Sequence, residues 1–245
     1  MLRSLKDLEG YKISATDGSI GKIYDFFIDD EFWTVRYVVA DTGQWLPGRK
    51  VLLAPSVLLQ SDWRERSFSV GLTRGQIESS PDIDTDKPVS RQRELELRDH
   101  YGWPYYWTGI GGVMPMPMAG IPPFNPPPSG SKPGDPHLRS VREIIGYGVR
   151  ATDGDIGKVS DFIADDESWI VRYLVVATSK WLPGRKVLIS PQWLVGPISW
   201  SSRKVTVIMS RASIKSSPEF EPHSPVNRDY ERQLYDFYGR PAYWS

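Results

Sequence analysis

The chain contains no cysteine and only three histidines among its 245 residues. Without cysteine there is no disulfide, no thiolate nucleophile and no Cys-ligated zinc or iron–sulfur site, and three scattered histidines leave little for an imidazole-rich metal centre. We therefore expect no metal and no cofactor. Thirty basic residues balance thirty acidic ones, so the chain also lacks the overall positive charge of a non-specific nucleic-acid binder. The sequence thus carries no strong nucleic-acid signal, although a local basic patch is compatible with this balance.

Long apolar runs are also absent. The nearest candidate for a spanning segment, residues 109–124, contains four prolines, which would break a transmembrane helix. The first eleven residues carry four charges and no apolar run follows them, so no secretory signal is predicted. We expect a cytoplasmic protein whose association with the inner membrane, where it occurs, is peripheral.

An internal duplication is the strongest feature that is present. Residues 10–55 align without a gap on residues 146–191, and about 29 of the 46 positions are identical. The longest identical block, Trp45–Leu52, recurs as Trp181–Leu188. This alignment predicts two domains, residues 1–107 and 138–245.

Residues 108–137 separate the two copies. Nine prolines and six glycines make up half of this segment, which is typical of a linker with polyproline character. Its apolar residues leave two interpretations open, a loose spacer or a segment that docks into a partner's groove.

Each copy predicts five or six short strands. An Asp-Gly pair, Asp17-Gly18 or Asp153-Gly154, predicts a hairpin turn, and the alternation from Trp33 to Val39 predicts a strand with one buried face. Short strands in this order favour a mainly β fold of two small antiparallel barrels in tandem. Each barrel precedes a predicted short helix and an aromatic tail; Asn227 is the expected N-cap of the second helix.

Both copies resemble the PRC-barrel domain. The likeness is carried by Gly-Tyr, then Ala-Thr-Asp-Gly-Ser-Ile-Gly-Lys-Ile-Tyr-Asp-Phe-Phe-Ile-Asp-Asp, then Val-Arg-Tyr-Val-Val-Ala, and by the Tyr-Gly-x-Pro-x-Tyr-Trp tails. The family includes the H subunit of the purple-bacterial photosynthetic reaction centre, whose cytoplasmic barrel caps the quinone-bearing core. It also includes the C-terminal domain of the ribosome maturation factor, which engages a ribosomal protein. Both roles are docking roles, but the chain has neither a predicted membrane anchor nor a separate N-terminal barrel.

The Pro-Gly turns provide the candidate interaction surface. Each turn is surrounded by one tryptophan and two cations, which suit contact with a phosphate, an RNA or an acidic partner. The alternative is a tryptophan packed over the barrel mouth with solvated cations. The residues of this candidate surface are Trp45, Arg49, Lys50, Trp181, Arg185 and Lys186.

Two acids lie on otherwise apolar strand faces. Asp25 and Asp161 are in phase with apolar neighbours and are therefore candidates for buried carboxyl groups. One interpretation is a proton carrier with a raised pKa. The other is an acid paired with Arg36 or Arg172, or bonded to backbone amides, because buried charges are normally compensated.

Two further motifs give no predicted site. Gly18-Ser19-Ile20-Gly21-Lys22 has too few residues between its glycines for a Walker loop, and Ile23 stands where Ser or Thr is needed. The acidic runs 29–31 and 165–167 lack EF-hand spacing and are interpreted as solvated turns.

These features together predict a non-enzymatic adaptor or scaffold. Its resemblance to the H subunit implies docking onto a cytoplasmic-face membrane or electron-transfer complex. The alternatives are a ribosome- or RNA-associated assembly factor and a small-ligand-binding protein. The expected partner is a protein of unknown identity, within a peripheral membrane complex in the leading interpretation. The aromatic tails predict that the two repeats pack together or that the chain forms a homo-oligomer.

Overall fold

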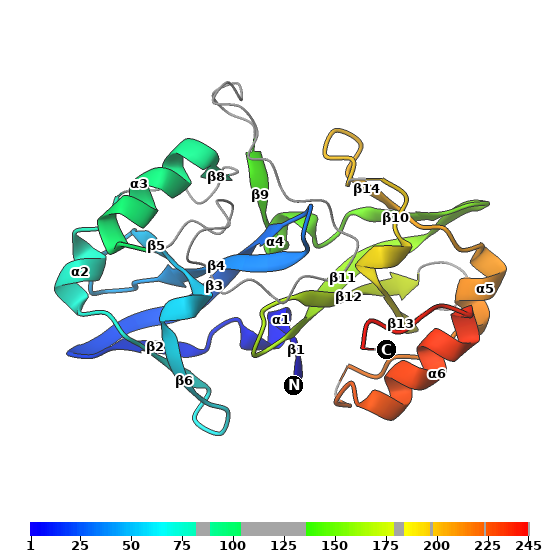
Figure 1. Ribbon diagram of the computed structural model, residues 1–245, viewed down its shortest axis with the longest axis horizontal. Helices are drawn as coiled ribbons and strands as arrows, with labels where there is room; N and C mark the ends of the chain where they lie inside the picture. Colours follow the sequence, from blue (N-terminus) through cyan, green and yellow to red (C-terminus); the bar gives the residue numbers. More distant parts are fainter. Residues whose placement is uncertain (82–88, 104–135, 179–183, 197, 223, 245) are drawn as a thin grey trace.

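The computed structural model describes residues 1–81, 89–103, 136–178, 184–196, 198–222 and 224–244. Its two repeats lie side by side along the long axis of the molecule (Figure 1). We label the elements in chain order, with η for the short 3-10 helices.

The first repeat contains eight strands and three α-helices in its described part. Their bounds are β1 (Leu2–Ser4), α1 (Leu5–Leu8), β2 (Lys12–Ala15), β3 (Gly18–Asp29), β4 (Thr34–Asp41), β5 (Lys50–Leu53), η1 (Pro55–Val57), β6 (Leu58–Asp62), β7 (Ser67–Val70), α2 (Arg74–Glu78), β8 (Val89–Ser90) and α3 (Arg91–Tyr101).

The second repeat follows the same order in the part that the structure describes. Its elements are β9 (Pro136–Ser140), α4 (Val141–Ile144), β10 (Gly148–Ala151), β11 (Gly154–Asp165), β12 (Val171–Thr178), β13 (Lys186–Ile189), η2 (Pro191–Trp193), β14 (Lys204–Thr206), α5 (Arg211–Ser216) and α6 (Arg228–Tyr238). β9 begins two residues inside the segment that was predicted as linker. Asn227 caps α6 as predicted, because its side chain accepts a hydrogen bond from the Tyr230 amide.

The expectation of two closed antiparallel barrels is wrong in two respects. The sheets have the orders β5-β4-β3-β2-β7-β6 and β13-β12-β11-β10-β14, and neither closes into a barrel over the described residues. Each sheet is also mixed, because β2 pairs with β7 and β10 with β14 in parallel. The fold is mainly β, as predicted.

The two repeats exchange their first strands. β1 of the first repeat pairs antiparallel with β11, and β9 of the second repeat pairs antiparallel with β3. Leu2 lies opposite Asp165, and Leu138 lies opposite Asp29, so the two pairings share one register. In Figure 1, β9 accordingly lies in the half of the molecule that β3 and β4 occupy. Each sheet is therefore completed by backbone from the other repeat.

The hairpin tips of the two repeats also bond to each other. The Val35 amide donates to the Trp169 carbonyl at 2.9 Å, and the Val171 amide donates to the Trp33 carbonyl at 2.7 Å. Trp169 is 8% exposed and packs against Phe26 and Phe68 of the first repeat, with ring centroids 6.2 and 6.4 Å away. This tryptophan from the other repeat covers core side chains of the first sheet, which explains how an unclosed sheet keeps its core dry.

Arg3 adds a further contact between the repeats. Its guanidinium Nε lies 3.0 Å from the Asp166 carboxylate and its Cζ lies 4.0 Å from the centre of the Trp63 ring. The equivalent Arg139 lies 4.0 Å from the ring of Trp200. In the described part of the chain, the contact between the repeats is thus made by strands, hairpin tips and arginines. The predicted contact through the aromatic tails includes residues 104–107, which lie outside the described residues.

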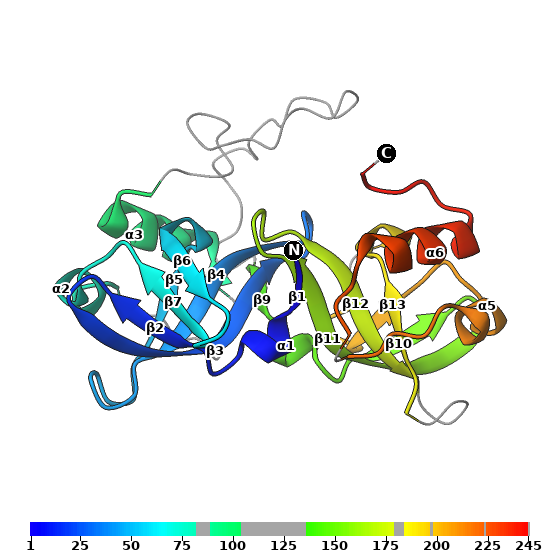
Figure 2. The same cartoon turned by 90° about the horizontal axis from the view of Figure 1, so that it is seen from below.

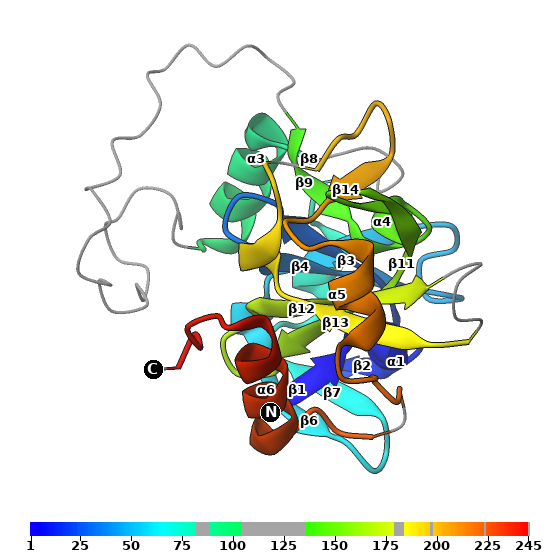
Figure 3. The same ribbon diagram turned by 90° about the vertical axis from the view of Figure 1, so that its right-hand side faces the viewer.

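The long helices cover the outer face of each sheet. Phe27, Tyr37 and Val39 belong to a second buried cluster, separate from the main core, and pack with Leu97 of α3. Residues 25–29 of β3 and 37–40 of β4 are consequently buried on both faces of the sheet. Figure 2 shows α3 and α6 on one side of the molecule and α1 on the opposite side. Viewed along the long axis, α5 and α6 of the second repeat face the viewer (Figure 3).

The second aromatic tail packs on its own repeat. The rings of Tyr243 and Trp244 lie 6.2 and 5.1 Å from the ring of Tyr235, a residue of α6. Residues 104–107 of the first tail lie outside the described part of the chain.

Gly21 is required by the close approach of two strands. A Cβ at this position would lie 1.9 Å from the carbonyl oxygen of Asp41, and φ is +146°. We expect Gly21→Ala to lower the free energy of unfolding by about 2 kcal/mol, measured by urea denaturation. Gly75→Ala is the matched control, because a Cβ at Gly75 in α2 would meet no atom within 4 Å. A Gly21→Ala protein as stable as the Gly75→Ala control would contradict this explanation.

Candidate functional site

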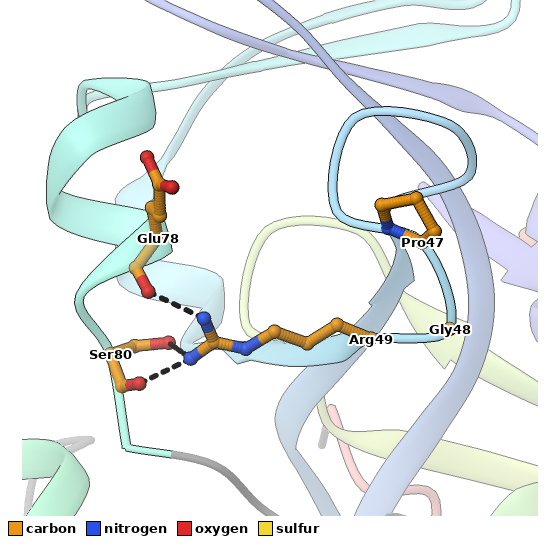
Figure 4. A pocket seen from close by; sticks show the side chains of 5 residues that line it. All are labelled: Pro47, Gly48, Arg49, Glu78 and Ser80. Atoms are coloured by element: carbon orange, nitrogen blue, oxygen red, sulfur yellow. Dashed lines mark hydrogen bonds between the residues drawn. The ribbon is translucent and has the colours of Figure 1, made fainter.

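Arg49 lies between the Pro47–Gly48 turn and the end of α2, beside a hollow of about 380 Å³ (Figure 4). Its guanidinium donates to the backbone carbonyls of Glu78 and Ser80, and lies 3.3 Å from the Ser80 hydroxyl. The positive charge is thereby directed toward carbonyl oxygens within the fold.

Arg185 repeats this arrangement in the second repeat. It donates to the carbonyl of Lys215 at 2.8 Å and to that of Ser217, and its Nε lies 3.9 Å from the carboxylate of Glu219. Both arginines hold the segment after a short helix against the start of a strand. Both guanidinia are partly exposed and bonded to carbonyls of the fold, contacts that the sequence interpretation did not include.

The other residues of the predicted interaction surface have separate neighbours. The guanidinium of Arg74 lies 4.6 Å from the centre of the half-buried Trp45 ring, and the Lys50 ammonium lies 4.0 Å from the Tyr24 ring. Lys186 is partly buried at the start of β13, and Trp181 lies outside the described residues. The structure therefore does not gather the described members into one aromatic and cationic cluster.

Asp25 lies at the contact between the repeats and is 3% exposed. It accepts hydrogen bonds from the Ser140 hydroxyl, from the Arg142 amide at 3.2 Å and from the Phe26 amide at 2.7 Å. Ser140 is also the N-cap of α4, because its hydroxyl accepts from the Glu143 amide. The carboxylate of the first repeat therefore holds the start of a helix from the second.

Asp161 has the reciprocal partners. It accepts from the Ser4 hydroxyl, from the Lys6 amide at 3.1 Å and from the Phe162 amide at 2.7 Å. Ser4 is the N-cap of α1. From the sequence, an arginine or backbone amides were considered as the partner of each acid. In the structure, backbone amides donate hydrogen bonds to both acids.

Burial raises the pKa of Asp25 and of Asp161 above the usual range for aspartate. Desolvation, which penalises the charged form, is the largest cause, and the hydroxyl and amide donors oppose it. The acids have the raised pKa that the proton-carrier interpretation needs, but their oxygens are occupied by donors that join the repeats.

These shifts predict a dependence of stability on pH. An acid whose pKa is higher in the folded state takes up its proton at a higher pH than in the unfolded chain, so the free energy of unfolding rises as the pH falls through the folded pKa. We expect a stabilising contribution on going from pH 7 toward about pH 4, where unfolded aspartate titrates. Urea denaturation across this range should show the contribution in the native chain and its loss in Asp25→Asn/Asp161→Asn. An unchanged pH profile in the double variant would contradict the prediction, and Asp62→Asn at the exposed end of β6 is the control.

Arg36 and Arg172 make other contacts. Arg36 forms an ion pair with Asp29 of the same hairpin at 3.3 Å, and the guanidinium of Arg172 lies 4.1 Å from the centre of the Tyr243 ring. The predicted pairs of Asp25 with Arg36 and of Asp161 with Arg172 are therefore replaced by hydrogen bonds across the two repeats.

Two buried glutamates were missed from the sequence. Glu94 is 0% exposed and accepts from the Tyr37 hydroxyl at 3.2 Å, while Glu231 is 2% exposed and accepts from the hydroxyls of Tyr173 and Tyr243, both at 2.8 Å. The available signal was their helical position. Each glutamate lies three residues before a buried leucine, Leu97 or Leu234. Residues three apart in a helix share one face, so the glutamate lies on the buried face.

The acidic hairpin tips are organised by turns. The Asp29 carboxylate accepts from the amides of Glu31 and Phe32, and that of Asp165 accepts from the Ser168 amide. Among the described residues, no group of three or more His, Asp or Glu side chains is placed to hold a metal ion.

Comparison with known protein families finds one match, over the second repeat. Residues 136–207 match the PRC-barrel domain. The matched range contains β9, α4 and β10–β14, that is, the sheet of the second repeat and the strand that this repeat gives to the first. A search of curated proteins found no match to the chain. In the described part of the chain, no helix is both long and apolar enough to cross a membrane.

Proposed function

We propose that this PRC-barrel-containing chain is a non-enzymatic adaptor that docks onto a membrane or electron-transfer complex at the cytoplasmic face. The observation that carries the proposal is the reciprocal exchange of β1 and β9. Because each sheet takes a strand from the other repeat, the two repeats form one body with two equivalent sets of surfaces. Such a body presents two binding faces at a fixed separation, and binding at one face raises the effective concentration at the other.

The buried polar groups also favour a structural role. Asp25 and Asp161 contact helix starts, and Glu94 and Glu231 contact tyrosines beneath a covering helix. These acids stabilise the association of elements, and their oxygens face donors of the chain itself. An acid that works in catalysis needs access to a substrate atom. A docking role therefore requires no change in the contacts of these acids. The resemblance to the reaction-centre H subunit supports a partner on the membrane side.

The ribosome- or RNA-associated alternative rests on Arg49 and Arg185. Both guanidinia donate to backbone carbonyls, so part of their donor capacity is already used within the fold. The structure thus gives this alternative less support than the sequence did.

Fractionation of the host lysate tests the proposal. We expect the chain in the membrane fraction, in a complex recoverable with mild detergent and identifiable by cross-linking and mass spectrometry. Recovery with ribosomes, with loss of the association at high salt, would favour the alternative. Recovery only as the free, uncomplexed protein would contradict both docking roles.

A further inference from the structure

The contact between the two repeats has two-fold symmetry. Thr34 lies opposite Ile170, which occupies the equivalent position in the second repeat. The two bonds between the hairpin tips flank this bridge and are exchanged by the same symmetry. In Figure 1, α3 and α6 accordingly lie at diagonally opposite corners of the molecule, as do β6 and β14. A contact in which one position meets its own equivalent is self-complementary, like the contact in a symmetric dimer.

The buried hydrogen bonds across the contact share this symmetry. The Ser140 hydroxyl donates to Asp25, and the Ser4 hydroxyl donates to Asp161. Among the residues of these hydroxyl bonds, of the bonds between the tips and of the central bridge, only the two bridge residues differ in type between the repeats. The contact therefore does not require that the two repeats belong to one chain.

Trp169 favours a pair made of one first and one second repeat. Its ring packs against Phe26 and Phe68 of the first repeat. Val205 of β14 takes the place of Phe68 in the second sheet, on the strand that pairs in parallel with β10. In a pair of two second repeats, Trp169 would therefore meet a valine where Phe68 stands and would lose one aromatic contact.

The connection between the repeats is longer than the contact requires. β8 and β9 are paired, with Ser90 opposite Pro136, and α3 begins at the residue after Ser90. The 11 residues of α3 extend about 17 Å. About six extended residues would therefore return the chain to β9, whereas residues 102–135 connect the two elements. Connections of this length are uncommon inside compact domains and are commonly functional segments or linkers.

Pairing between two chains keeps every contact of pairing within one chain. The two forms differ in the entropy of the connection, which holds the repeats of one chain at an effective concentration on the order of 1 mM. A single chain therefore closes on itself in dilute solution. Two chains exchange their repeats where the local concentration approaches this value.

We propose that the contact surface of each repeat also binds a second copy of this chain, by exchange of repeats. The first repeat of each copy pairs with the second repeat of the other, so β1 of one chain completes the sheet that contains β11 of its partner chain. The first sheet is incomplete without the other copy, which then supplies β9 and Trp169. When both pairs of repeats form between the same two chains, the product is a closed pair with four repeats. This inference goes beyond the adaptor role and does not depend on the identity of the docking partner.

Cysteine cross-linking tests the exchange, because the native chain contains no cysteine. Arg3 on β1 lies opposite Ala164 on β11, a spacing that suits a disulfide. Chains with Arg3→Cys and chains with Ala164→Cys are mixed in urea, refolded together at about 1 mM or at about 10 μM, and oxidised. We expect a disulfide between the two kinds of chain after refolding at about 1 mM, and at least about ten-fold less of it at about 10 μM.

Two controls use the same substitutions. Arg3→Cys/Ala164→Cys in one chain should form the disulfide within that chain at about 10 μM, which verifies the geometry. Chains with Arg3→Cys refolded alone at about 1 mM measure random oxidation, because two copies of this position do not lie opposite each other in the exchanged pair. A cross-link in the mixture no greater than in this second control would overturn the proposal.

Light scattering of the native chain provides a second test that needs no substitution. After refolding at about 1 mM, part of the native protein should have twice the single-chain mass of 27.8 kDa. Native protein that refolds only to the single-chain mass would overturn the proposal as well. Either failure would leave the membrane-docking adaptor standing, because a single chain already presents both repeats.

Discussion

Replacing Trp169 with alanine is expected to lower the free energy of unfolding by about 3 to 5 kcal/mol. The side chain is 8% exposed and packs against Phe26 and Phe68 of the other repeat. Its removal opens a cavity in the first sheet's core and also withdraws the second repeat's contribution to that core. Urea denaturation followed by far-ultraviolet circular dichroism measures the effect.

Trp33→Ala is the matched control for this prediction. Both tryptophans have positive φ, 52° at Trp33 and 57° at Trp169, so both substitutions change the same backbone preference. Trp33 is only half-buried, so its replacement should destabilise the chain by less. Equal effects of the two substitutions would show that backbone strain, rather than insertion into the other repeat, determines the loss.

Glu231→Ala is expected to lower the free energy of unfolding by about 3 kcal/mol. Glu231 accepts hydrogen bonds from Tyr173 and Tyr243 and lies 3.0 Å from the Arg228 guanidinium. Alanine would leave the fully buried Tyr173 hydroxyl without this acceptor. Arg228 contributes little to the loss because nearly half of its side chain is exposed.

Glu231→Gln separates the hydrogen bonds from the charge. One carboxylate oxygen, Oε1, accepts from both tyrosines, and the amide oxygen of glutamine can replace it. We therefore expect a loss of about 1 kcal/mol or less for Gln. Burial and then the hydrogen bond to Glu231 raise the pKa of Tyr243 to about 12. A Gln variant as unstable as the Ala variant would show that the charge matters more than the acceptor geometry.

Local features of the fold were predictable because their causes are local. Asp17-Gly18 and Asp153-Gly154 form hairpin turns, and the alternating residues after Trp33 form β4, because turn preference and period-two burial are properties of adjacent residues. Asn227 could be recognised as an N-cap for the same reason.

The strand exchange could not be derived in the same way. β1 has three residues, too few for a periodic pattern, and its partner Asp165 lies far along the chain. The available signal was the triplet Leu-Arg-Ser, which occurs at residues 2–4 and again at 138–140, before the aligned blocks begin. This repeated triplet contains Ser4 and Ser140, which bond to Asp161 and Asp25.

Only part of the candidate site could be predicted from the sequence, because its interacting groups also lie far apart in the chain. Asp25 and Asp161 were recognised as acids on apolar faces, but their hydroxyl partners come from the other repeat and depend on the topology. Arg49 and Arg185 were recognised as cations beside a turn, whereas the carbonyls of Glu78 and Lys215 that they meet lie in the last turn of a helix some 30 residues later in the chain. Pairing over such distances has no local sequence pattern.

Cleavage of the chain between its repeats tests the central claim most directly. A protease site is introduced after Met118, the full-length protein is purified and cut, and the products are analysed by size-exclusion chromatography with light scattering. Because each sheet contains a strand from the other repeat, we predict that the fragments remain together as a one-to-one complex of about the uncut mass, 27.8 kDa. Separation of two folded fragments without denaturant would contradict the account.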